Sequence, residues 1–66
     1  MTKFWLIDTY AIGADGKPDF FEFLSRHEFA DEDEAYAFVK DFNNENFYTY
    51  PEPAKAYASV FGVIEK

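Results

Sequence analysis

The absence of cysteine is the feature that most constrains how this chain can fold. A domain of 66 residues buries only about 60% of the surface that its unfolded chain exposes. No disulfide and no thiolate zinc site can add to its stability. The core must therefore consist of apolar side chains, and here these are mostly aromatic, with nine Phe, five Tyr and one Trp. The length predicts a single domain over residues 1–66.

Three segments have the composition of β-strands. Residues 3–12 and 19–29 are rich in aromatic and β-branched types and predict two strands. Gly13–Pro18 between them predicts a turn, because glycine accepts positive φ and proline donates no main-chain hydrogen bond. Residues 55–65 predict a third strand, which follows an extended connection over residues 47–54.

A helix is expected between the second and third strands. Asp31 is a favourable N-cap, and Glu34 three positions later predicts a capping box. Four apolar residues then follow the i, i+3, i+4, i+7 spacing of an amphipathic helix: Ala35, Phe38, Val39 and Phe42. The segment 43–46 is expected to end the helix, since Asn tolerates the left-handed conformation of many C-caps.

The order of these elements predicts a small α+β domain of the type β-β-α-β. We expect a three-stranded sheet, antiparallel or mixed, with the spatial order 2-1-3 and one helix packed on it. The first strand is the most apolar of the three and suits the centre of the sheet.

One helix covers only one face of such a sheet, yet both faces are expected to be apolar. Strict alternation in the first strand places Phe4, Leu6, Tyr10 and Ile12 opposite Trp5 and Ile7. In the second strand it places Glu22, Leu24, Arg26 and Glu28 opposite Phe21, Phe23, Ser25, His27 and Phe29. In the third it places Tyr57, Phe61 and Val63 opposite Val60 and Ile64. An uncovered aromatic face commonly marks an interface; the alternative is that the 43–54 loop covers it with Phe47, Tyr48 and Tyr50.

The net charge of −7 is confined to one segment. Residues 28–52 hold eight acids against one base, Lys40, whereas the remaining residues hold five of each sign. Nucleic acid binding requires Lys and Arg to neutralise phosphates, so direct binding of nucleic acid is not expected. A basic protein is the natural partner of such a segment.

The sequence offers little for catalysis or cofactor binding. Ser25 and His27 would share one strand face, but no glycine-rich elbow surrounds the serine, and we expect no enzymatic activity. The acids 31–34 follow one another on a helix and point about 100° apart, so they predict neither a metal site nor a calcium loop. No phosphate-binding glycine motif and no cofactor are expected.

No segment approaches the roughly 20 apolar residues that a membrane span needs, and the first residues do not form a secretory signal. These features predict no membrane partner and a cytoplasmic protein, in the cytoplasm of the host cell if the gene is carried by a phage.

The acids of the helix suggest a function. Glu34, Asp41 and Glu45 project along one flank of the apolar stripe, and Asp31 begins the same side. A row of carboxylates can imitate a row of phosphates. In size, charge and aromatic content the chain is similar to small acidic bacteriophage proteins that act against host nucleases, glycosylases and CRISPR complexes, and this resemblance implies an inhibitor that mimics DNA. The alternative is that these acids are a solvated, solubilising face.

The leading hypothesis is therefore a non-enzymatic protein-binding module that inhibits a nucleic-acid-handling complex such as a nuclease or CRISPR effector. A second hypothesis is a structural or assembly domain that forms a homodimer through its exposed aromatic sheet face. A third is an immunity protein or antitoxin against a basic toxin. Two tyrosines near prolines in the following loop would add stiff contact area. The candidate partner-binding residues are Asp31, Glu34, Asp41, Glu45, Tyr48, Tyr50 and Glu52.

Overall fold

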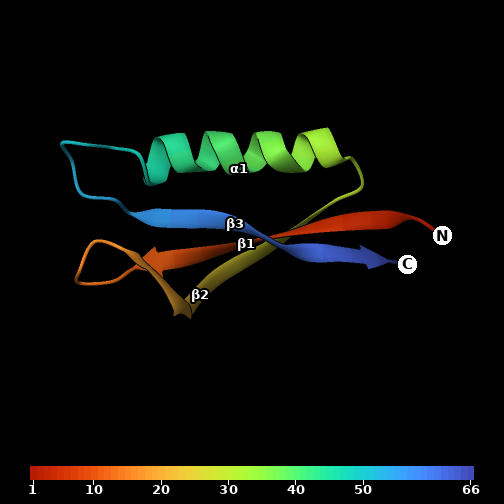
Figure 1. Cartoon of the computed structure of the whole chain (residues 1–66), viewed down its shortest axis with the longest axis horizontal. Coiled ribbons are helices and arrows are strands. Elements are labelled where there is room, and N and C mark those ends of the chain that lie inside the picture. Colours follow the sequence, from red (N-terminus) through yellow and green to blue (C-terminus); the bar gives the residue numbers. More distant parts are fainter.

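A computed structural model describes all 66 residues of the chain. The elements follow the order β1 (Lys3–Ile12), β2 (Pro18–Phe29), α1 (Glu32–Asn46) and β3 (Ala56–Glu65). The three strands form one antiparallel sheet with the order β2-β1-β3. The predicted α+β fold, strand order and single helix are thus confirmed (Figure 1).

The helix packs on the sheet face that contains Trp5 and Ile7. Ile7, Ala35 and Ala58 are fully buried and form the centre of the contact between helix and sheet. Both alanines are small, which allows α1 to approach the sheet closely. Five larger side chains surround this centre: Trp5, Phe29, Phe38, Val39 and Phe42. The three apolar helix positions predicted after Ala35 therefore point into the core as expected.

The β1–β2 connection is a tight turn. Gly13 donates a main-chain hydrogen bond to Lys17 (2.8 Å), and Gly16 donates one to Gly13 (3.0 Å). Gly16 has a φ of 79°, which is the left-handed conformation that glycine accepts without a steric penalty. The Asp15 side chain accepts a hydrogen bond from the Lys17 N–H (3.0 Å) and fixes the turn. β2 begins at Pro18, one residue earlier than predicted, opposite Ile12.

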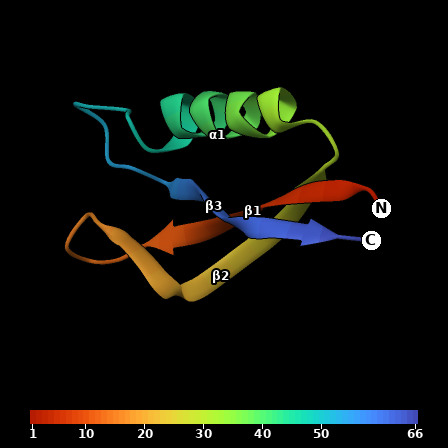
Figure 2. The same cartoon turned by 45° about the vertical axis from the view of Figure 1, so that its right-hand side comes forward.

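A bulge in β2 changes which side chains share a face. Thr9 lies opposite Ser25 and Tyr10 opposite Phe23, so Leu24 is an extra residue between the two pairs. Phe23 therefore lies on the face of Tyr10 and not on that of Ser25, so its predicted placement is wrong; the register shifts again between Tyr10 and Ile12. β2 bends sharply away from β1 along its length (Figure 2), as bulged strands do.

A second bulge, in β3, also corrects the prediction. Ile7 lies opposite Val60 and Leu6 opposite Gly62, which leaves Phe61 as the extra residue. Beyond it, Val63 pairs with Trp5 and Ile64 with Phe4. Val63 thus lies on the helix side of the sheet and Ile64 on the opposite side, the reverse of the predicted assignment.

The two ends of α1 differ from expectation in part. Asp31 is the N-cap, as predicted, and its side chain accepts from the Asp33 N–H (2.8 Å). No hydrogen bond from Glu34 returns to Asp31, so the predicted capping box is wrong. The helix includes Asn43 and continues to Asn46, and no residue other than glycine has a positive φ. The expected left-handed Asn cap is therefore also wrong; instead the Asn43 carbonyl accepts from the N–H groups of Phe47 (2.8 Å) and Tyr48 (2.7 Å).

The chain ends lie side by side at one end of the sheet (Figure 1). Thr2 and Lys66 exchange two main-chain hydrogen bonds, of 3.0 and 2.9 Å, which extend the β1–β3 ladder beyond both strands. The hairpin turn lies at the other end of the sheet.

Candidate functional site

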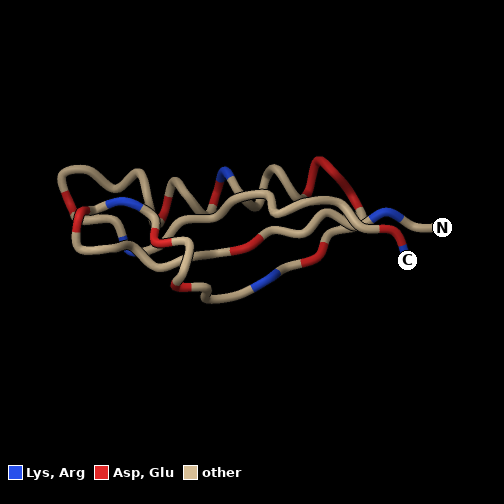
Figure 3. Tube along the Cα trace, turned by 60° about the horizontal axis from the view of Figure 1, so that its bottom comes forward, with Lys and Arg blue, Asp and Glu red and all other residues tan.

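The acidic strip along α1 is exposed and unpaired. We use this name for Asp31, Glu34, Asp41 and Glu45. All four side chains are solvent-exposed, and none forms an ion pair, because the protein has only two ion pairs and both lie elsewhere. Positions 34, 41 and 45 are separated by seven and four residues, close to whole turns of a helix with 3.6 residues per turn. They therefore share one flank of α1, and Figure 3 shows acidic segments along the length of the helix.

The acidic strip lies beside Phe38 on the helix surface, on the side of α1 that faces β2. Phe38 stacks against His27 (4.7 Å between ring centroids) and Phe29 (5.3 Å), both of β2. On the opposite flank, Asn43 bonds to Ala58 of β3. The strip therefore lies on the flank of α1 that faces β2.

The other three predicted site residues lie in the loop after α1. Glu52 donates its N–H to the Thr49 carbonyl (2.9 Å), and the Thr49 hydroxyl donates to the Glu52 carbonyl (3.0 Å), so the loop closes on itself. Tyr48 and Glu52 are exposed, Tyr50 is 96% exposed, and the Tyr50–Pro51 peptide bond is cis. These residues lie beyond the C-terminal end of α1, whereas Asp31 lies at its N-terminal end, so the seven predicted residues are spread along the helix and the loop after it.

The sheet face turned away from α1, here named the open sheet face, is not covered by the loop. Of the three aromatic residues predicted to cover it, Tyr50 is 96% exposed and Tyr48 packs on Phe47 (4.9 Å). Only Phe47 packs on a strand residue, Tyr57 (4.8 Å). The open sheet face comprises Phe4, Leu6, Asp8 and Tyr10 of β1, Phe20, Phe23, Arg26 and Glu28 of β2, and Tyr57, Ser59, Phe61 and Ile64 of β3.

Aromatic rings form a continuous track across the open sheet face. Phe20 packs edge-to-face on Tyr10 (4.9 Å) and Tyr57 (6.4 Å), and Tyr10 contacts Phe23 (6.4 Å). Phe20, Phe23 and Phe61 remain 60%, 54% and 62% exposed. An uncovered aromatic face was predicted from the sequence, but these residues were not among the predicted site residues. The run Phe20-Phe21-Glu22-Phe23-Leu24 was the available signal, because four large apolar residues in five are unusual on an exposed strand.

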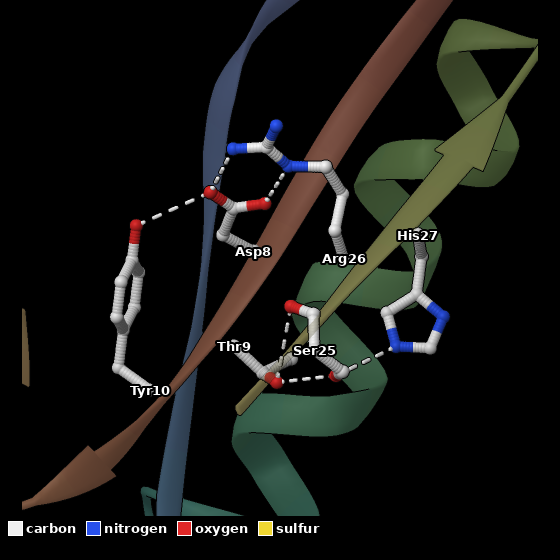
Figure 4. A network of polar contacts seen from close by, with 6 residues as sticks. All are labelled: Asp8, Thr9, Tyr10, Ser25, Arg26 and His27. Atoms are coloured by element: carbon white, nitrogen blue, oxygen red, sulfur yellow. Dashed lines mark hydrogen bonds and ion pairs between the residues drawn. The ribbon is translucent and has the colours of Figure 1, made fainter. Parts of the chain in front are cut away.

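Arg26 and Asp8 form a paired charge in the middle of this face (Figure 4). Arg26 Nε and Nη2 donate to the two oxygens of the buried Asp8 carboxylate, at 2.6 and 2.8 Å. The guanidinium also lies over the Phe61 ring, 4.3 Å from its centroid. The hydrogen bonds from Arg26 lower the pKa of Asp8, and they outweigh the burial that would raise it. Burial and the nearby Asp8 charge raise the pKa of the Tyr10 hydroxyl.

Ser25 and His27 share the other face of the sheet and are hydrogen-bonded. Ser25 Oγ lies 3.1 Å from His27 Nε2 and 2.6 Å from Thr9 Oγ1, so the three side chains form a short polar chain (Figure 4). No carboxylate bonds to the second ring nitrogen of His27. The principal surface hollow, about 520 Å³ and widely open, lies at the hairpin turn, between Gly13 and Phe21. Ser25 and His27 thus have the contact of a nucleophile with its base. No third polar group orients the His27 ring, and no cavity adjoins the pair.

No three His, Asp or Glu side chains converge in a way that could hold a metal ion. No helix is long and apolar enough to cross a membrane. Comparisons with known protein families, with curated proteins and with solved structures found no significant match.

Proposed function

We propose that this protein is a non-enzymatic protein-binding module that recognises a basic partner through the acidic strip and the loop after it. The observation that supports this best is that all four strip carboxylates are exposed and none forms an ion pair. Carboxylates that are already paired have little left to offer a partner. These four retain their full charge for steering and for ion pairs across an interface.

The proposed partner is a protein that handles nucleic acid. With a rise of 1.5 Å per residue, positions 34 and 41 are separated by about 10 Å along the helix, and positions 41 and 45 by about 6 Å. These spacings are near three and two steps of about 3.4 Å, the axial charge spacing of one DNA strand. A cationic groove that follows a phosphate backbone could therefore bind this helix. Tyr48 and Tyr50 would supply apolar contact at the end of the strip.

A matched pair of triple variants tests the strip. Glu34→Gln/Asp41→Asn/Glu45→Gln neutralises it, and Asp15→Asn/Glu22→Gln/Glu65→Gln changes the net charge equally at exposed positions away from it. Interface ion pairs of about 0.5–1 kcal/mol each predict that the first variant loses about 10- to 100-fold in affinity. The control variant should bind nearly as tightly as the wild type. Equal losses in the two variants would show that only net charge matters and would remove the strip as the recognition surface.

The partner is to be captured with the wild-type protein and with both triple variants. A true partner is retained by the wild type and by the control variant, and is lost from the strip variant. It is also released when salt rises from about 0.1 M to about 1 M, because the Debye length falls from about 10 to about 3 Å. A nucleic-acid-handling partner should then release a short DNA duplex in proportion to the protein added. A partner that keeps its DNA duplex would contradict the proposal that this protein mimics DNA. It would favour the role of an immunity protein or antitoxin.

A further inference from the structure

The open sheet face has no covering element. In two views that differ by 45°, α1 lies on one side of the sheet and no element lies on the other (Figures 1 and 2). Leu6 is buried on this face, at 4% exposure, but three phenylalanines of the same face are more than half exposed: Phe20, Phe23 and Phe61. Exposed apolar groups gathered on one face of a small protein indicate a contact surface.

The charges of the open sheet face cancel. Both ion pairs of the protein lie on it: Arg26 with Asp8 (2.6 Å), and Lys66 with Glu28 (2.9 Å). The Lys66 ammonium also lies 5.3 Å from the centre of the Phe4 ring. The paired groups contribute no net charge, so the −7 of the protein resides in the other ionisable side chains. This face therefore offers nothing to attract a strongly basic partner, and nothing to repel a second copy of the chain.

The molecule has more surface and a longer shape than its mass requires. Its accessible surface of 4707 Å² exceeds the roughly 4,300 Å² expected for a folded monomer of this mass. Its radius of gyration of 12.6 Å exceeds the roughly 11 Å expected for this length. Three strands about 4.8 Å apart and about 33 Å long give a flat footprint of about 470 Å² per copy. Two copies would bury roughly 1,000 Å² in total, which is near the lower limit for a specific interface.

We infer that the open sheet face is a homodimer interface, in which two sheets pack face to face and the helices lie outside. Facing sheets lie about 10 Å apart, and each acidic strip lies on the far side of its own sheet. The two strips are then separated by more than the Debye length of about 8–10 Å at moderate ionic strength. The dimer would thus bury its neutral aromatic surfaces and present two acidic strips on opposite outer faces.

Sedimentation velocity over about 10 μM to 1 mM tests this inference, because an interface at the lower size limit predicts a dissociation constant in the micromolar range. Phe61→Gln and Phe23→Gln should each raise that constant at least about 10-fold, as expected for buried aromatic anchors. Tyr36→Gln is the matched control, since Tyr36 is 51% exposed on α1 and outside the open sheet face. It should leave the constant unchanged. Thermal unfolding of each variant establishes that it is folded.

The location of the contact is measured on the wild-type protein, so that the test does not depend on the stability of a variant. Between dilute and concentrated samples, amide NMR signals of Leu6, Asp8 and Ser59 should shift, and those of the acidic strip should not. The dimer should also persist or tighten at about 1 M salt, where binding through the strip is screened. A monomer at every concentration would overturn the inference. So would a dimer whose shifts lie on α1 or only along the outer edge of β2.

Discussion

The side chain of Asn43 forms with the main chain of Ala58 the two hydrogen bonds that a neighbouring strand would otherwise form. Asn43 Nδ2 donates to the Ala58 carbonyl (2.9 Å), and Asn43 Oδ1 accepts from the Ala58 N–H (2.7 Å). β3 is an edge strand of the sheet, and these two bonds satisfy main-chain groups that would otherwise be buried without partners. Since unpaired edges invite further strand pairing, the helix both covers the sheet and closes part of its β3 edge.

Asn43→Ala should lower the free energy of unfolding by about 2–3 kcal/mol, because it leaves a buried N–H and a buried carbonyl without partners. Asn44→Ala, at an exposed position of the same helix turn, should change it by less than about 0.5 kcal/mol. Urea denaturation followed by circular dichroism measures both. Equal effects in the two variants would mean that the Asn43 bonds add nothing beyond helix propensity.

The close approach of α1 to the sheet predicts a strict limit on side-chain size at Ala58, which is 0% exposed. Ala58→Leu should destabilise the fold by about 1–3 kcal/mol, because overpacking forces α1 away from β3. Ala37→Leu makes the same change at an exposed helix position and should be nearly neutral. Thermal and urea denaturation give the comparison, and a neutral Ala58→Leu would show that the helix can move without loss.

The Asp8–Arg26 pair predicts a loss of stability in acid. The folded-state pKa of Asp8 is lowered, above all by its hydrogen bonds with Arg26. Its contribution is therefore complete above the unfolded-state pKa of about 3.9 and is lost as the pH falls through the folded-state value. Asp8→Asn should reduce the slope of unfolding free energy against pH below about pH 4. Unchanged slopes in the two proteins would assign the acid sensitivity to other carboxylates.

The raised pKa of Tyr10 predicts a loss of stability at alkaline pH. Its pKa is raised, first by burial and then by Asp8. The neutral phenol is thus favoured in the folded state, and its contribution is lost as the pH rises above about 10 toward the folded-state pKa. The wild type should therefore lose unfolding free energy as the pH rises from about 8 to above about 10, and Tyr10→Phe should lose less over the same range. Ultraviolet difference spectra of tyrosinate, combined with urea denaturation at each pH, report this, and parallel pH profiles would contradict it.

Gly16 and Gly62 provide a matched test of backbone conformation. Gly16 has a φ of +79°, whereas Gly62 has no such constraint, and an added Cβ would meet no atom within 4 Å at either position. Gly16→Ala should therefore cost about 1–2 kcal/mol through backbone strain alone. Gly62→Ala should be neutral or stabilising by up to about 1 kcal/mol, since it stiffens the unfolded chain. Dilute samples keep the comparison free of self-association.

Local composition and periodicity were enough to predict the strand order and the helix. β1 is the most apolar strand and occupies the centre, and the apolar spacing from Ala35 to Phe42 defines the buried side of α1. The faces of the strands were predicted only in part. A bulge inserts one residue and reverses the alternation beyond it. Leu24 carries no local signal for one, whereas Gly62 beside Phe61 is the kind of strand-interior glycine that often marks a bulge. Strict period-two reasoning therefore misplaced Phe23, Val63 and Ile64.

The candidate site was predictable to a similar degree. The strip acids are exposed because they lie off the apolar side of α1, which the helical period alone indicates. The ion pair of Glu28 was not predictable from local periodicity. It belongs to the acidic segment of the sequence, yet it pairs with Lys66, 38 residues away, at 2.9 and 3.0 Å. That pairing depends on β2 and the chain end lying on opposite sides of β1, which only the assembled sheet determines.

The adjacency of Thr2 and Lys66 makes this fold suitable for circular permutation. A short glycine-containing linker could join the two ends, and new ends could be opened at the exposed residues Ala14 or Asp15 without cutting a strand. The same adjacency means that tags or fluorophores fused at either end would emerge together, at the opposite end of the sheet from the hairpin turn.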